Sequence, residues 1–223
     1  MSTQTEGFIG WLVGGMIRRS TRSRLRNLYW SSPQEPLTAP VIFYCNHHGW
    51  LDGYILFHVV ERLKLKALDW IEEFDAFPLF ARVGGMRYAA GDTTGRATTI
   101  RKTIRLMNSE KFSLMLFAEG VLHRPPTIWP LGKALQLVAE KVKGVTLVPT
   151  AIYYEHSIHE RPEAWVSLGT SHAFSSIDDC QSRLESELVK LRERVGNNEE
   201  FPILARGTGD VNERMSMKRF AKK

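Results

Sequence analysis

Cysteine is scarce in this sequence, and the two cysteines, Cys45 and Cys180, stand far apart. Disulfide frameworks and thiolate metal sites need more cysteines at regular spacings, so neither is predicted, and a reducing compartment is the default. Histidines do cluster near residue 47, but no HExxH or comparable metal-binding spacing exists. We therefore expect no metal site and no permanently bound cofactor.

Long apolar runs are also missing. A membrane-spanning helix needs roughly 18 to 20 apolar residues, and the best stretch, residues 8–17, is too short. Arginines follow this stretch, from Arg18 to Arg26, whereas a signal peptide has its positive charge before the apolar run. An apolar segment containing Trp11 and flanked by arginines is typical of a helix at a membrane surface. Three glycines weaken the helix, and the alternative is a helix packed on the domain with a solvated basic end.

The overall charge is positive. The formal net charge is +6 and the sequence pI is about 9.4, which favours an anionic partner: nucleic acid, membrane headgroups or a phosphorylated substrate. Basic residues are not interleaved with aromatics as in a nucleic-acid-binding module, so we expect no nucleic acid partner. With 223 residues, 43% of them hydrophobic, the chain can bury the core of one large domain.

Strand patterns alternate with helix patterns along the chain. Strands are expected over 41–45, 65–70, 82–89, 112–117, 145–153 and 164–168, and helices over 51–63, 72–80, 95–109, 132–143 and 182–195. This order predicts a single α/β domain with a mostly parallel or mixed central sheet covered by helices on both faces. We place this domain at 37–196. It follows an apolar and basic helical segment at the membrane surface, 1–36, and precedes a basic tail, 197–223.

A histidine followed by an aspartate stands at the end of the first buried strand. His47 comes two residues after Cys45, and Asp52 follows five residues later, where a helix pattern begins. A neutral imidazole takes a proton near neutral pH, and a carboxylate on the opposite ring nitrogen fixes its tautomer. The spacing alone leaves a structural alternative, in which Asp52 caps the helix and His47 is an ordinary turn residue.

Two further features lie at strand positions. Glu119 and Gly120 end the apolar run 112–117, at the edge where α/β proteins bind ligands, although a plain strand-end turn would look the same. Pro149 interrupts an apolar strand and predicts a bulge or an edge position, because proline removes a hydrogen bond of the ladder.

Taken in order, these features resemble the glycerolipid acyltransferase family. The family's NHxxxxD motif is matched by Asn46-His47 to Asp52, its FPEGTR-like motif by residues 117–122, and its VP-containing strand by residues 147–152. The order and separations fit over residues 38–172.

The resemblance implies transfer of a fatty acyl group from acyl-CoA or acyl-ACP to a hydroxyl of a lipid acceptor. His47 would be the general base and Asp52 would orient it, without a covalent acyl-enzyme. Substrate binding would fall to six residues: Asn46, Arg87, Glu119, Gly120, Arg124 and Lys133. The enzyme would lie in the cytoplasm, peripheral on the inner face of the cell membrane.

Departures from the family pattern lie outside the His–Asp pair. No arginine stands at the expected end of the second motif, where Arg87 or Arg96 would have to substitute. Ala118 replaces a proline, Val121-Leu122 replace threonine and arginine, and Gly49 stands where serine is common. The acceptor would then be a lysophospholipid or a related lipid alcohol, glycosylated ones included. The alternative is a non-catalytic, lipid-binding relative of the same fold.

Overall fold

A single sheet of eight strands organises the part of the chain that the computed structural model describes, residues 7–156 and 158–215. Its order is β4-β3-β5-β2-β6-β7-β1-β8. The strands are β1 (Asn27–Ser31), β2 (Val41–Cys45), β3 (Ala67–Ile71), β4 (Gly85–Arg87), β5 (Ser113–Phe117), β6 (Thr146–Glu155), β7 (Glu163–Leu168) and β8 (Ile203–Arg206).

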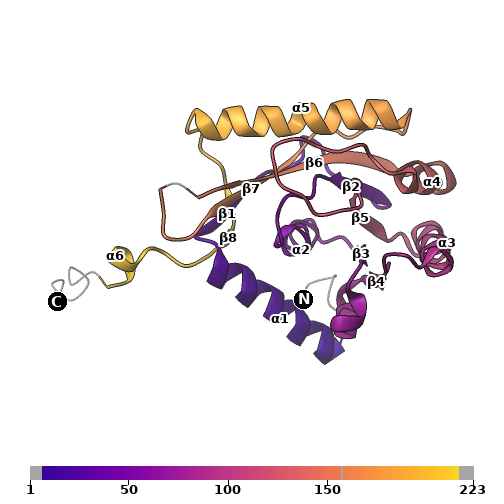
Figure 1. The fold of residues 1–223 in the computed structure, drawn as a ribbon, viewed down its shortest axis with the longest axis horizontal. Helices are drawn as coiled ribbons and strands as arrows, with labels where there is room; N and C mark the ends of the chain where they lie inside the picture. The colour runs from indigo at the N-terminus through magenta and orange to yellow at the C-terminus, as the bar shows by residue number, and fades with distance from the viewer. Residues whose placement is uncertain (1–6, 157, 216–223) are drawn as a thin grey trace.

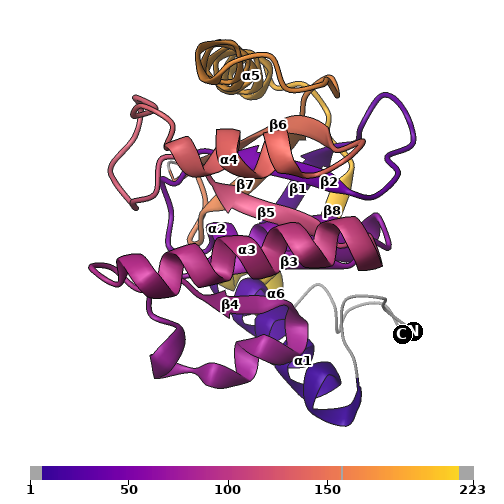
Figure 2. The same cartoon turned by 90° about the vertical axis from the view of Figure 1, so that its right-hand side faces the viewer.

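Helices cover both faces of this sheet (Figures 1 and 2). They are α1 (Gly7–Arg24), α2 (Asp52–Arg62), α3 (Thr93–Glu110), α4 (Lys133–Lys141), α5 (Ile177–Gly196) and α6 (Val211–Arg214), with two 3₁₀ turns, η1 (Phe74–Ala76) and η2 (Pro78–Val83). Helices α3, α4 and α5 pack on one face, and α2 packs on the other with α1 outside it. The predicted single α/β domain with a mixed sheet is confirmed.

The direction of the strands decides where a site can form. Strands β4, β3, β5, β2 and β6 are parallel, whereas β7 is antiparallel to β6. The loops after β2 and β5 therefore leave the sheet at one common edge, together with the end of β6. Ligands bind at this carboxyl edge in open α/β sheets.

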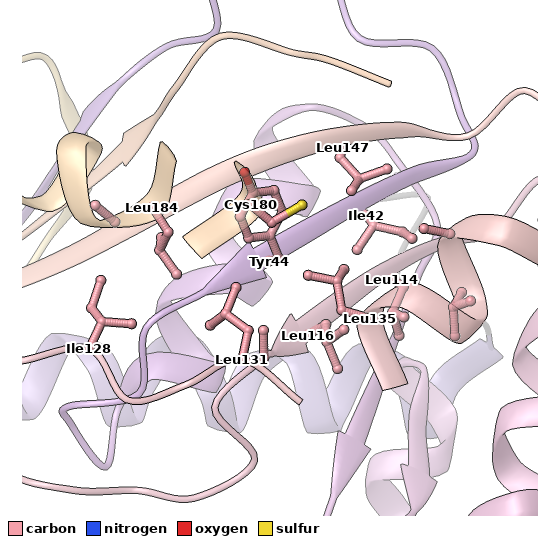
Figure 3. Close-up of a cluster of buried hydrophobic side chains, with 14 of the residues drawn as sticks. Ile42, Tyr44, Leu114, Leu116, Ile128, Leu131, Leu135, Leu147, Cys180 and Leu184 are labelled. Carbon is pink, nitrogen blue, oxygen red and sulfur yellow. The ribbon is translucent and has the colours of Figure 1, made fainter. Parts of the chain in front are cut away.

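The core explains why the central strands read as continuous apolar runs. On one face, Tyr44 and Leu114 pack with Leu135 of α4 and Leu184 of α5 (Figure 3). On the other face, the apolar side of α2 packs on the same strands. All five residues of β2 are buried, because a strand covered on both faces has no solvent side.

Two strands were missed by the sequence analysis. Strand β1 lies in the segment that we expected to be helical, and it pairs with β7 and β8. Strand β8 lies in the predicted basic tail, while the cations at 218–223 fall outside the described residues. The sheet thus includes residues on both sides of the range 37–196. Both strands are short, and pairing with distant segments rather than a local pattern makes them strands.

The predicted helix over 72–80 is wrong. The chain forms the two 3₁₀ turns η1 and η2 instead, separated by Phe77, whose backbone is not helical (φ −147°, ψ 76°). Pro78 explains the break, because a proline disfavours the helical conformation of the residue before it.

Pro149 lies at a bulge, as predicted, but not at an edge. Strand β6 pairs with both β2 and β7. The register shifts by one residue between the pair Thr150–Leu168 and the isolated bridge Leu147–His172, and the Pro149 carbonyl accepts from Gly169 N at this point. The missing N–H of the proline therefore falls where the ladder is already irregular.

Helix α1 is apolar on two sides. Val13 and Ile17 pack on Phe57 and Val83. The opposite side exposes apolar side chains: Phe8 (72% exposed), Ile9 (41%), Trp11 (59%), Leu12 (48%) and Met16 (37%). No described helix has the length and apolarity needed to cross a bilayer.

The arginines after this segment do not act together. Arg18 forms an ion pair with Glu61 at 2.8 Å. Arg26 forms another with Glu213, in which the closest pair of atoms is 2.6 Å apart. The remaining cations of the helix, Arg19, Arg22 and Arg24, are exposed. The basic cluster that the sequence suggested is therefore reduced to these three.

Candidate active site

His47 and Asp52 meet at the carboxyl edge of the sheet. The loop after β2 folds back so that His47 Nδ1 lies 2.9 Å from Asp52 Oδ2. The imidazole stacks on the Phe117 ring at the end of β5, with 4.1 Å between ring centroids. A carboxylate can only accept at this nitrogen, so the Nδ1–H tautomer is favoured and Nε2 is left with its lone pair.

Asp52 is fully buried, yet every side of its carboxylate is satisfied. Oδ2 accepts from the backbone N–H groups of His48 and Gly49, each at 2.9 Å, besides the His47 ring. Oδ1 accepts from the Tyr154 hydroxyl at 2.6 Å. The carboxylate also stands in the first turn of α2, where the helix dipole favours negative charge. Four donors thus fix both the turn and the orientation of His47.

Tyr154 explains the glycine at position 49. A Cβ at Gly49 would lie 2.5 Å from the Tyr154 ring, so no side chain fits there while the tyrosine holds Asp52. Burial raises the pKa of Tyr154 well above its ordinary value, and the charge of Asp52 adds to this effect. The phenol therefore stays protonated and can donate. Gly49, which departs from the family pattern, is the consequence of a tyrosine 105 positions further along the chain.

Glu119 ties the loop after β2 to the loop after β5. Its side chain is fully buried. Oε1 accepts from the His47 N–H at 2.8 Å, and Oε2 accepts from the Trp129 N–H and faces His123 Nε2, both at 2.5 Å. The His123 N–H in turn donates to the His47 carbonyl at 3.1 Å. Glu119 thus positions the backbone of the histidine rather than facing open space.

Asn46 joins the same edge to β6. Its side chain is buried, accepts from Ile152 N at 2.8 Å and donates to Ile152 O at 3.0 Å. Its amide also lies 3.1 Å from His48 Nδ1. We predicted that Asn46 binds substrate, but its amide oxygen and nitrogen already contact Ile152 and His48 of the protein itself.

Two cavities open on His47, whose side chain is 22% exposed while that of Asp52 is fully buried. The first, about 470 Å³, lies among α1, α2, β3 and the 3₁₀ turns. Its walls are mostly apolar and contain no lysine or arginine; among them are Met16, Phe57, Phe77, Phe80 and Met115. The second, about 350 Å³, lies beside Gly120 and the start of α4, and it contains Arg96 and Lys133.

The predicted cationic binding residues separate into two groups. Lys133 lines the second cavity with His47, and so does Arg96, which lies 4.7 Å over the Tyr88 ring. Arg87 is instead exposed and paired with Asp75 and Asp92 at 2.8 and 2.6 Å.

Arg124 is exposed as well and lines neither cavity. Gly120, at φ +75°, lines the second cavity at the turn after β5. The structure therefore brings Gly120, Lys133 and Arg96 to the histidine and leaves Arg87 and Arg124 outside.

Among the described residues, one group could place three metal ligands near one another: His48, Glu119 and His123, with ligand atoms within 4.8 Å. These atoms already have partners. His48 Nε2 lies 3.2 Å from the Thr127 carbonyl, and Glu119 makes the contacts given above. Burial lowers the pKa of His48, so its ring is neutral near neutral pH. We assign no metal to this group, because binding one would break the contacts that hold the loops.

Fold and site together define an α/β protein with a His–Asp pair, the aspartate buried, at the carboxyl edge of its sheet. A family model described as "Acyltransferase" matches residues 22–153, more than half of the chain. The chain therefore belongs to the Acyltransferase family, and the resemblance seen in its motifs is confirmed at this level.

A solved structure shares the fold. It is the crystal structure of the 1-acyl-sn-glycerophosphate (LPA) acyltransferase PlsC from Thermotoga maritima, with a TM-score of 0.54, 14% identity, and coverage of 85% of this chain and 81% of that chain. At this identity the likeness shows the fold alone. No match was found among curated proteins.

Three residues of the site were missed by the sequence analysis. Tyr154 and His123 carry no local pattern that marks them, because their partners are set by the tertiary fold. Asp69 of β3 could have been found, because it is an acidic residue inside a short run with strand character, Ala67–Ile71.

Proposed function

We propose that this protein is an O-acyltransferase in which His47 is the general base. The observation that supports this role is the contact of His47 Nδ1 with a carboxylate fixed by three other donors, which leaves Nε2 free beside two cavities. Nε2 would take the proton of the acceptor hydroxyl as its oxygen attacks the carbonyl carbon of an acyl thioester. The new ester bond forms, the C–S bond breaks, and the leaving thiolate takes the proton from the imidazolium.

The two cavities suit two different substrates. The apolar cavity of about 470 Å³ suits an acyl chain, since burial of each methylene contributes about 0.8 kcal/mol. The second cavity holds two cations, Arg96 and Lys133, and suits an anionic group. With His47 between them, the thioester carbonyl and the hydroxyl would meet at Nε2. The donor would be acyl-CoA or acyl-ACP.

The acceptor in this proposal is a lysophospholipid or a related lipid alcohol. The structural neighbour named above is an LPA acyltransferase, and the Arg96–Lys133 pair could receive a phosphate. Neither Arg87 nor Arg124 lines this cavity, so fewer cations face the acceptor than we predicted. An acceptor other than a simple glycerol phosphate is therefore included in the proposal.

The exposed side of α1 is proposed to rest on a membrane surface, on the inner face of the cell membrane. Phe8, Trp11 and Leu12 lie on a helix that also carries the exposed Arg19 and Arg22. Apolar side chains would enter the headgroup region, and the arginines would attract anionic lipids at about 1 kcal/mol each. Co-sedimentation with vesicles that contain anionic lipid tests this: Trp11→Ser with Phe8→Ser should abolish binding, whereas Val189→Ser, an exposed apolar residue of α5, should not.

Thiol release from acyl-CoA, measured over a panel of lysophospholipids and lipid alcohols, tests the reaction. His47→Ala should lower the rate by at least about 1000-fold and Asp52→Asn by about 100-fold or more, with the fold retained by circular dichroism. Undiminished release in folded His47→Ala would refute the mechanism. If the wild-type protein released no thiol with any donor or acceptor while still binding fatty acids, the non-catalytic lipid-binding alternative would hold.

A further inference from the structure

Asp69 is an acid inside the apolar cavity. It lies in the middle of β3, in register with Met115 of β5 and Gly85 of β4, on the sheet face that α2 covers. It lines the same cavity as His47, and its Oδ1 is buried with no hydrogen-bond partner among the described residues. The general-base mechanism does not use it.

A buried acid with one unpaired oxygen is unfavourable. The desolvation of an unpaired polar group costs about 1 to 3 kcal/mol, and more when the group is charged. Burial raises the pKa of Asp69 to about 6, although the nearby His47 and a hydrogen bond from the Trp70 backbone N–H act in the opposite direction. The acid is therefore mostly ionised at neutral pH. Its Oδ1 then lacks a donor: no lysine or arginine lines the cavity, and none of the described residues donates a hydrogen bond to this oxygen.

The surroundings narrow the kind of donor. A Cβ at Gly53 would lie 3.6 Å from Asp69 Oδ2, so the carboxylate abuts the first turn of α2, directly after Asp52. The remaining wall is mostly apolar and aromatic. Glu72 and Glu73 carry negative charge and would not donate to the carboxylate, and the indole N–H of Trp70 already donates to Thr103. An occupant with a single uncharged donor and otherwise apolar surface fits these walls. The donor must sit near the His47 end, where the reacting carbonyl would lie.

We propose that Asp69 selects acyl donors with a hydroxyl close to the thioester, such as 3-hydroxyacyl chains, by accepting a hydrogen bond from that hydroxyl. This inference rests on the proposed function, because it assigns the acyl chain to the apolar cavity. Asp69 is a specificity residue here: the hydroxyl binds to it, while the acyl transfer at the carbonyl proceeds as described above. A plain chain of the same length leaves the carboxylate unpaired and buried against methylenes.

The test compares tetradecanoyl-CoA with 3-hydroxytetradecanoyl-CoA as donors, each with the best acceptor of the panel. The wild-type protein should favour the hydroxylated donor in kcat/KM by about tenfold or more. Asp69→Leu should reverse the preference, because it fills the position with an apolar side chain. Glu110→Gln, an exposed acid of α3, is the charge control and should keep the wild-type ratio. Comparison with 12-hydroxytetradecanoyl-CoA tests position: this distal hydroxyl should give no advantage.

The outcomes separate this inference from the proposed function. Thioester turnover with the same donor ratio in the wild-type protein and in folded Asp69→Leu would overturn the role of Asp69 and leave the acyltransferase intact. If no turnover were seen, displacement of a fluorescent fatty acid by tetradecanoic and 3-hydroxytetradecanoic acids would decide. A wild-type preference for the hydroxy acid that Asp69→Leu loses supports the inference, and equal displacement in both proteins overturns it.

Discussion

The hydroxyl of Tyr154 donates to Asp52 Oδ1 at 2.6 Å and so joins the end of β6 to the start of α2. Its ring also occupies the space where a side chain at position 49 would stand. The tyrosine and the glycine therefore depend on one another. Asp52 keeps both oxygens paired only because this one phenol reaches it across the carboxyl edge of the sheet.

Tyr154→Phe tests that dependence. It removes the donor and leaves Oδ1 of a buried carboxylate unpaired, so we expect kcat to fall about tenfold with a small change in KM. An unchanged kcat would show that the three remaining donors suffice.

A double-mutant cycle extends the test to Gly49. Gly49→Ser alone should be destabilising and nearly inactive, because its Cβ meets the Tyr154 ring. Combined with Tyr154→Ala, the serine gains space, and the pair should be more active than Gly49→Ser alone by a measurable coupling energy of about 1 kcal/mol or more. Additive losses would contradict the geometry.

Glu119→Gln tests the tie between the two loops. The carboxylate faces three groups, the His47 N–H, the Trp129 N–H and the His123 ring, and an amide has only one oxygen to accept with. We expect a loss of about 2 to 4 kcal/mol in the free energy of unfolding, measured by urea denaturation, together with a lower kcat. Glu110→Gln, exposed at the end of α3, should stay within about 0.5 kcal/mol.

Arg96 and Arg87 give opposite expectations for an anionic acceptor. Arg96→Ala removes a cation from the cavity beside His47, so KM for a lysophosphatidic acid acceptor should rise about tenfold. Arg87→Ala breaks exposed pairs with Asp75 and Asp92, which solvent screens, and should leave KM within about twofold. With a neutral acceptor, both variants should have the KM of the wild type. A larger rise in KM for Arg87→Ala than for Arg96→Ala would show that Arg87, not Arg96, binds the anionic group.

We expect Asp69 to make the stability of the fold depend on pH. Because the folded state raises its pKa to about 6 from the ordinary value of 3.8, the folded protein binds this proton more tightly than the unfolded chain. The group therefore destabilises the fold above about pH 6, and the penalty disappears as the pH falls through 6 towards 4.

Asp69→Leu should accordingly raise the free energy of unfolding at pH 8, by about 1 to 3 kcal/mol, and its advantage should shrink near pH 4. His47, Glu72 and Glu73 line the same cavity in both proteins, so the difference in stability between the two proteins isolates Asp69. Urea denaturation at the two pH values measures it. A constant difference would mean that the carboxylate is solvated in the cavity.

Much of the fold could be predicted because its central elements are locally self-consistent. The runs Val41–Cys45 and Ser113–Phe117 are apolar at every position, as strands buried on both faces must be. Strands β1 and β8 were not predicted, because a short strand forms through pairing with distant segments and carries little local pattern of its own. The 3₁₀ turns around Pro78 were not predicted, because the apolar spacing there favours a helix while the proline disfavours one.

By itself, the sequence predicted the His47–Asp52 pair through its match to the NHxxxxD motif, whereas the five-residue spacing alone left a helix cap at Asp52 as an alternative. It also determined that Glu119 follows a buried strand. Only the tertiary structure decided that Tyr154 completes the hydrogen bonding of the Asp52 carboxylate and that Arg96 rather than Arg87 reaches the cavity beside the histidine. It also decided that Asp69 lines an apolar cavity with one oxygen unpaired among the described residues. The physical reason is that parallel strands distant in sequence end at one edge of the sheet, and no local pattern records which side chains meet there.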